Sequence, residues 1–258
     1  MHIERADHVM AFVDHEQAID FEAAHEFHRL RRQPIGTCHL RVGGHDVGNF
    51  GGVNIDAAAE QTAQIAVEGA EEVRARLAEI VAQTAARGGK LLIPAFAVGR
   101  TQELVYELHA LARAKRIPEI PIFIDSPLAT DATAVFEMNP DSFDTSEHLV
   151  SEVAELFRFP LVRYTRDTEE SKQLNAMRGP MVIIAASGMA ESGRILHHLA
   201  NGADDPRNTI LIVGFMAEHT LGRRILAKSP IIKVFGDEMP LRANVEVLNG
   251  YSAHGDRR

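Results

Sequence analysis

Short apolar segments that alternate with amphipathic helical segments constrain the fold more than any other feature of this chain. The segments 90–96, 120–124, 181–185 and 209–213 are apolar along most of their length, and not only at every second position. A strand that is apolar throughout is buried on both faces, and strands that alternate with helices form parallel sheets. The sequence therefore predicts an α/β fold with a doubly wound, largely parallel sheet.

The helical segments follow a three- and four-residue apolar spacing. The first has Val73, Leu77 and Ile80 on one face and ends at two glycines, which favour a helix stop. We predict helices over 68–87, 101–111, 194–200 and 221–227. The segment from 130 to 166 is predicted to be irregular and largely helical. In residues 1–66 we predict only short strands such as 39–42.

Composition limits the kinds of site that the chain can carry. Cys38 is the only cysteine, so an internal disulfide is excluded and a metal site would use His, Asp or Glu. The net charge of -9 argues against binding nucleic acid through a global positive field. The sequence shows no membrane-spanning apolar stretch and no leader, so we expect a cytoplasmic protein without membrane contact.

Polar, glycine-containing loops follow the predicted strands. In a parallel sheet such loops share one edge, where ligands bind. Glycines let a phosphate approach the backbone, and arginine can bind it bidentately. The loops after the first three predicted strands contain Arg100, Ser126, Ser187, Gly188 and Arg194, and a fourth such loop spans 215–222.

A purely structural interpretation of these loops remains open, in which the glycines make turns and the hydroxyl groups cap helices. The dinucleotide fingerprint G-x-G-x-x-G and a Walker A lysine are both absent from the sequence, which disfavours a Rossmann-like nucleotide-binding domain.

His254 lies between small residues and two positions before Asp256. A histidine beside a carboxylate can transfer a proton or bind a metal, although an isolated loop histidine is more often structural or exposed.

Four motifs, in this order and at these separations, resemble a known family. They are LLIPAFAVGR at 91–100, FIDSPLA at 123–129, ASGM with GRILHHL at 186–199, and GYSAHGD at 250–256. The chain is similar to metallo-β-lactamase-fold RNA-processing nucleases that carry a β-CASP domain, a family that includes ribonuclease J. The resemblance covers about residues 67–258.

The resemblance implies an enzyme with two zinc ions that hydrolyses phosphodiester bonds of single-stranded RNA. In such a reaction two cations stabilise the attacking and leaving oxygens, and a general acid protonates the leaving ribose. His254 matches the family histidine assigned to that proton transfer. The five loop residues named above are expected to line the RNA path. Family members are often dimers, so a homodimer or a partner subunit is expected.

The chain also departs from the family. Its sequence contains no His-x-His-x-Asp-His motif and no terminal His-Gly-Glu motif, which supply zinc ligands in the family. The stretch around His25 resembles a segment that donates a zinc-binding histidine, and Glu60 resembles a family acidic motif that serves catalysis. Asn49 stands where the family has a metal-bridging aspartate, and a neutral amide cannot replace that anion. We therefore predict an incomplete zinc site, from a frameshift, a fragmentary gene model or drift after loss of activity.

These observations predict three segments. Residues 1–66 would be a partial or degenerate metallo-β-lactamase (αββα) segment, 67–247 the β-CASP domain, and 248–258 the truncated start of the C-terminal RNA-metabolising segment. The leading hypothesis is a zinc-dependent RNA hydrolase that is weakly active or inactive alone. The alternative is a non-catalytic RNA-binding or assembly partner of an active nuclease.

Overall fold

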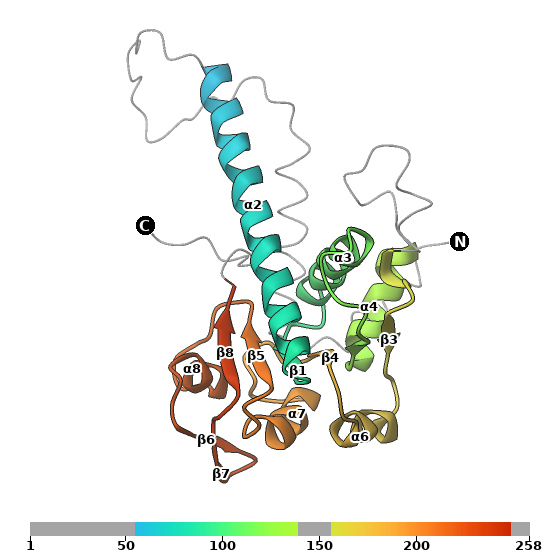
Figure 1. Ribbon diagram of the computed structural model, residues 1–258, viewed down its shortest axis with the longest axis vertical. Coiled ribbons are helices and arrows are strands. Elements are labelled where there is room, and N and C mark those ends of the chain that lie inside the picture. Colours follow the sequence, from blue (N-terminus) through green and yellow to red (C-terminus); the bar gives the residue numbers. More distant parts are fainter. Residues whose placement is uncertain (1–54, 139–155, 249–258) are drawn as a thin grey trace, which may run out of the picture. The chain divides into compact units, whose positions relative to one another are not determined.

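A computed structural model describes residues 55–138 and 156–248 (Figure 1). The chain divides into two compact units, residues 1–66 and 67–258. Of the first unit, the structure describes only the backbone at the start of helix α2, so the predicted αββα segment and its strand at 39–42 lie outside the described residues. The second unit contains the sheet and the helices that pack on it.

The second unit follows a β/α order for most of its length. The helices are α2 (Ile55–Ala86), α3 (Arg100–Arg113), α4 (Pro127–Met138), α6 (Thr168–Ala176), α7 (Arg194–Gly202) and α8 (Leu221–Leu226). The strands are β1 (Lys90–Pro94), β2 (Ile122–Ile124), β3 (Val162–Tyr164), β4 (Met181–Ala185), β5 (Thr209–Ile212), β6 (Ile231–Val234), β7 (Asp237–Pro240) and β8 (Asn244–Val247).

Six strands form one sheet in the order β3-β2-β4-β1-β5-β8, and every neighbouring pair in it is parallel. This confirms the predicted α/β fold with a parallel sheet. Strands β6 and β7 form a separate antiparallel hairpin.

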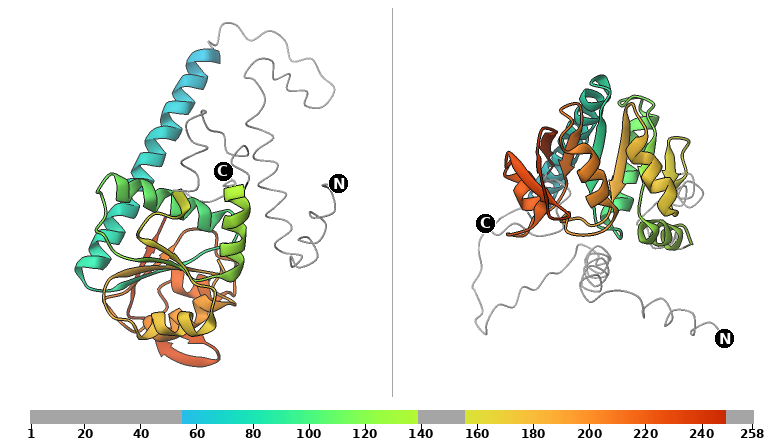
Figure 2. Two further views of the ribbon diagram at one scale, coloured as in Figure 1. Left: turned by 90° about the vertical axis from the view of Figure 1, so that its right-hand side faces the viewer. Right: turned by 90° about the horizontal axis from the view of Figure 1, so that it is seen from below.

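Successive residues of the central strands enter two different hydrophobic cores. In β1, Leu91 and Ile93 join the core with α2, α3 and α4, whereas Leu92 joins the core with α6, α7 and α8. Figure 2 shows helices on both faces of the sheet. Both faces need apolar side chains, which is why these strands read as uninterrupted apolar runs.

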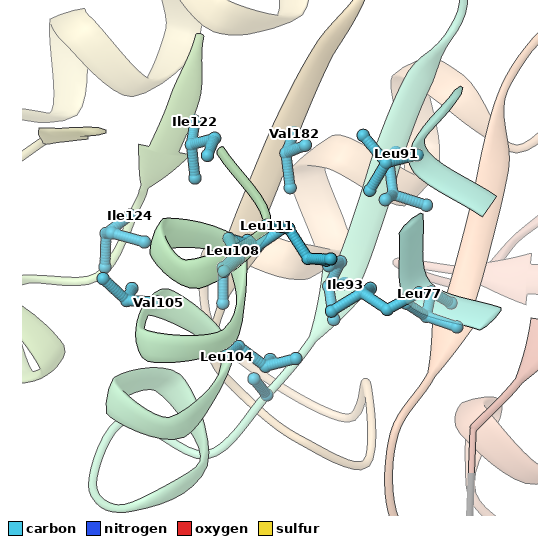
Figure 3. Packing of buried hydrophobic residues seen from close by; sticks show 14 of the residues in the cluster. Leu77, Leu91, Ile93, Leu104, Val105, Leu108, Leu111, Ile122, Ile124 and Val182 are labelled. Carbon is cyan, nitrogen blue, oxygen red and sulfur yellow. The ribbon is translucent and has the colours of Figure 1, made fainter. Parts of the chain in front are cut away.

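Helix α3 illustrates how one face is covered. Leu104, Leu108 and Leu111 are fully buried and point at Ile93 of β1 and Val182 of β4 (Figure 3). Their spacing of three and four residues places them on one stripe of the helix. The predicted helix of this segment is therefore confirmed.

Several elements of the fold were not predicted, namely β3, α6, the β6–β7 hairpin and β8. Strand β3 lies in the segment expected to be irregular and helical, and it has three residues with no fully buried side chain. The β6–β7 hairpin alternates exposed and buried residues along β6, as antiparallel strands with one solvated face do. Neither gives the continuous apolar signal that revealed the central strands. The first helix also begins earlier than predicted, at Ile55.

Within the described residues, no helix is both long and apolar enough to cross a membrane.

Candidate functional site at the strand-end edge

The loops that follow the parallel strands lie along one edge of the sheet, which we call the strand-end edge. It is formed by residues 95–99 after β1, 125–126 after β2, 165–167 after β3, 186–193 after β4 and 213–220 after β5. This is the edge at which open parallel sheets bind ligands.

Asp125 is the centre of a hydrogen-bond network at this edge. Its carboxylate is fully buried, and three side chains donate to it. Arg194 Nη1 lies 2.7 Å from Oδ1, while Ser171 Oγ and His198 Nε2 lie 2.5 Å and 2.6 Å from Oδ2. Burial alone would raise the pKa of Asp125, but the hydrogen bonds from His198, Ser171 and Arg194 hold that pKa below its usual value. The site therefore favours the charged carboxylate.

His198 extends the network toward helix α6. Its ring is buried, and its Nδ1 lies 2.8 Å from Oδ1 of Asn175. Through Ser171 and Asn175 on α6, and Arg194 and His198 on α7, the network joins both helices to the end of β2. A buried carboxylate needs such partners, because an unpaired one would be strongly destabilising.

The order of these groups differs from that of a nucleophilic triad. In such a triad the histidine lies between the hydroxyl and the carboxylate, so that it can accept the hydroxyl proton. Here Ser171 and His198 both bond the same oxygen of Asp125, and the carboxylate lies between them. The geometry does not activate Ser171 as a nucleophile.

Arg194 directs its guanidinium into the protein. Besides Asp125, its Nη1 donates to the carbonyl oxygen of Thr165 at 3.1 Å, and its Nη2 donates to that of Arg166 at 2.7 Å. Only 17% of the side chain is exposed. The arginine thus connects the end of β3 to the start of α7.

Ser187 orders the loop between β4 and α7. Its Oγ accepts hydrogen bonds from the backbone N–H groups of Glu191 and Ser192, each at 3.2 Å. The loop ends at Gly193, with φ 75° and ψ -168°, a conformation that essentially only glycine adopts. A Cβ at Gly193 would lie 2.4 Å from the carbonyl oxygen of Ala186. A Cβ at Gly188 would lie 2.9 Å from the ring of Phe96.

Neighbouring loops of the edge contact each other. The Gly222 N–H donates to the carbonyl oxygen of Met189 at 3.1 Å, and the Glu191 carboxylate accepts from the Leu221 N–H. These contacts connect the loop after β4 to the start of α8, which follows the loop after β5.

Ser126 has a local role at the start of α4. Its Oγ accepts from the Ala129 N–H at 3.2 Å, which caps the helix whose first residue is Pro127. The side chain is largely buried. This contact agrees with the interpretation in which the Ser126 hydroxyl group caps a helix.

Arg100 begins helix α3 and forms an ion pair with Glu103 one turn later. Its side chain is 12% exposed, whereas that of Glu103 is 46% exposed. An ion pair with an exposed partner contributes little to stability, so the guanidinium can exchange this partner for another anion at small cost.

The remaining sequence candidates cannot be placed. His25, Asn49 and His254 lie outside the described residues, and Glu60 lies in α2 without a described side chain. Among the described side chains of residues 71–138 and 156–248, no three or more His, Cys, Asp or Glu form a group that could hold a metal ion. These described residues therefore do not fit a zinc site.

Sequence reasoning missed the network around Asp125. The only available signals were the position of Asp125 directly after a buried strand and the four-residue spacing of Arg194 and His198 on one helix face. Neither signal identifies Ser171 or Asn175, because α6 was not predicted.

Comparison with known proteins identifies the family that the chain resembles. The family model for the Beta-Casp domain matches residues 101–225, which extend from the second residue of α3 into α8 and include the loops after β2, β3, β4 and β5. The chain is 41% identical over 178 residues to ribonuclease TTHA0252 of Thermus thermophilus, covering 68% of this chain and 41% of that protein.

Two further relatives are similar over the same region. The transcription termination factor FttA of Thermococcus kodakarensis is 37% identical over 195 residues, covering 73% of this chain and 30% of the factor. An RNase J-like protein of Methanocaldococcus jannaschii is 31% identical over 186 residues, covering 70% of this chain and 41% of that protein. The chain spans less than half the length of each of these relatives.

Proposed function

We propose that this chain, which belongs to the β-CASP family of RNA-processing nucleases, binds single-stranded RNA along its strand-end edge and serves zinc-dependent hydrolysis of RNA. The observation that carries the proposal is the row of polar loops and helix starts along one edge of a parallel sheet. Such an edge is long enough for several phosphates of a polymer. The printed names of the relatives, ribonuclease and transcription termination factor, agree with an RNA ligand.

Arg100 is the side chain at this edge that best suits a phosphate. It is the first residue of α3, where the helix dipole favours an anion. Its present partner, Glu103, is exposed and can be replaced by a phosphate oxygen. We assign phosphate contact to Arg100. Ser187 and Gly188 shape the neighbouring loop, Ser187 through its bonds to two backbone N–H groups and Gly188 by packing against Phe96.

The chemical step is assigned to residues that the structure does not describe. His254 would donate or position the proton for the leaving ribose, Glu60 would assist it, and His25 would be one zinc ligand. When bound, zinc would supply a nucleophilic hydroxide and stabilise the charge on the phosphate. Asn49 in place of the bridging aspartate supports weak or absent cleavage by this chain on its own.

Titration of a fluorescently labelled single-stranded RNA with the full chain, followed by anisotropy, tests the binding proposal. We expect modest affinity that falls steeply between 50 and 200 mM salt, because only local arginines oppose the net charge of -9. No binding at low salt, or a salt-independent affinity, would contradict the proposal.

A matched pair of variants locates the contact. Arg100→Gln should lower the salt slope of log Kd by about 0.7, the value for one phosphate contact on a single strand. Arg116→Gln is the control, because Arg116 follows the other end of α3 and pairs with Glu71. Equal effects of both variants would exclude a local phosphate contact at Arg100.

Metal content and cleavage separate the enzyme from the non-catalytic alternative, which Asn49 favours. Stoichiometric zinc in the purified chain, with RNA cleavage that His254→Ala abolishes, supports the enzyme. RNA binding without zinc and without cleavage supports a binding or assembly partner.

A further inference from the structure

The position of Arg194 suggests that it binds phosphate, but its contacts do not suit that role. Three of its N–H groups are bonded to protein acceptors, namely the carboxylate of Asp125 and the carbonyl oxygens of Thr165 and Arg166. A guanidinium has five N–H donors, so most of its hydrogen-bonding capacity is used inside the protein.

Exchange of Asp125 for an RNA phosphate would be costly. Asp125 is fully buried, so removal of Arg194 would leave a buried carboxylate with less compensation. Arg100 differs in this respect, because its partner Glu103 is exposed to water. The same kind of ion pair is therefore exchangeable at Arg100 and fixed at Arg194.

The ion pair of Arg194 with Asp125 also affects the loop that precedes Arg194 in the chain. Arg194 directly follows Gly193, the last residue of the loop that Ser187 orders. The Ile195 N–H also donates to the carbonyl oxygen of Ala186 at 3.1 Å, which closes the base of this loop. Anchoring the Arg194 side chain to Asp125 fixes the end of the loop at which Gly193 lies.

We infer that Arg194 is a positioning residue: Asp125 holds it so that the 187–193 loop is ordered for RNA, and Arg194 itself makes no phosphate contact. The RNA part of this inference rests on the proposed function, whereas the ordering of the loop does not. Two independent readouts therefore test it.

Hydrogen exchange of the full chain without RNA is the first readout. Arg194→Gln should speed exchange of the Glu191 and Ser192 amides by about tenfold or more, because the loop loses its anchor. Arg166→Gln is the control, since it removes an arginine at the same edge whose side chain is 61% exposed and pairs with exposed Asp131. Unchanged exchange in a folded Arg194→Gln variant would overturn the inference.

RNA binding with Arg194→Lys is the second readout. Lysine keeps the positive charge, so a phosphate contact would survive, but it lacks the guanidinium fork that joins Asp125 to two carbonyl oxygens. We expect Arg194→Lys to weaken RNA binding several-fold without a change in the salt slope. A slope lowered by about 0.7 in Arg194→Gln, together with near wild-type affinity in Arg194→Lys, would assign Arg194 to the phosphate and overturn the inference.

The double variant Asp125→Asn with Arg194→Gln covers the case in which Arg194→Gln alone does not fold. Removal of both charges leaves no uncompensated carboxylate. The loss of unfolding free energy and of amide protection in the double variant should therefore be smaller than the summed losses of the two single variants. Strict additivity would contradict a positioning pair. If no variant and no wild-type sample binds RNA, the proposed function fails, and the exchange data alone still decide the role of Arg194.

Discussion

The two edges of the central sheet use similar charged residues in opposite ways. At the strand-end edge, Asp125 is fully buried and its partners point inward. At the opposite edge, Arg207 pairs with Asp205 in an exposed position, and Lys90 donates to carbonyl oxygens. A pocket of about 190 Å³ lies there, lined by Lys90, Asn175, Arg178, Asp205 and Arg207 among others. The comparison shows that the burial of an ion pair, and not its presence alone, decides how strongly the fold depends on it.

Asp125→Ala should have the largest effect. It removes the carboxylate that compensates Arg194 and hydrogen-bonds His198, and loss of one partner of a buried pair costs about 3–5 kcal/mol. Asp205→Ala should cost much less, because its pair with Arg207 is exposed to solvent. Urea unfolding of both variants measures the difference, and equal losses would break the comparison between the two edges.

Acid should weaken the strand-end edge through the same group. The pKa of Asp125 is lowered in the folded protein, so the carboxylate contributes stability above its unfolded pKa of about 3.9. That contribution is lost as pH falls through the lowered folded pKa. The loss is expected to be smaller than in Asp125→Ala, because the protonated carboxyl keeps its atoms in place.

Unfolding free energies between pH 7 and pH 3 measure this dependence. In Arg194→Gln the acid loss should be smaller, because one group that lowers the pKa of Asp125 is gone and the folded pKa lies closer to the unfolded pKa. Asp237→Asn, which removes an exposed carboxyl of the β6–β7 hairpin, serves as the control. An unchanged acid profile in Arg194→Gln would show that Arg194 does not stabilise the charged carboxylate.

A glycine pair compares the backbone at the two edges. Gly193→Ala should cost about 2–3 kcal/mol, because its φ and ψ suit only glycine and its Cβ would meet a backbone oxygen. Gly88→Ala, beyond the end of α2, should cost about 1 kcal/mol, since its φ is also positive but no atom lies within 4 Å of the new Cβ. Thermal unfolding resolves the two values, and a larger loss for Gly88→Ala would reverse the expected order.

Lys90→Met should also give a small effect. The ammonium group donates to the carbonyl oxygens of Leu174 and Asn175 at 2.7 Å and 3.0 Å, at the end of α6. Burial, partly opposed by the charge of Asp205, lowers the pKa of Lys90, so its charge is already disfavoured there. We expect a loss of about 1 kcal/mol in urea unfolding, with exposed Lys228→Met as the control. A loss as large as that of Asp125→Ala would show that the two edges are equally sensitive.

The sequence predicted the parts of the fold that depend on local pattern. The four apolar runs are β1, β2, β4 and β5, because a strand covered on both faces must be apolar at every position. Strands β3 and β8 lie at the edges of the sheet and carry fewer apolar residues. They were missed because an edge strand needs less burial and leaves a weaker pattern.

The candidate site, too, was predicted only in part from the sequence. The sequence alone determined which loops follow the strands, and hence that Arg100, Ser126, Ser187 and Arg194 share one edge of a parallel sheet. Only the tertiary structure decided which of these side chains face inward. Asp125 and His198 are 73 residues apart, and Asp125 and Ser171 are 46 apart. The direction of a side chain depends on partners brought together by packing, and no local periodicity encodes a contact over such a separation.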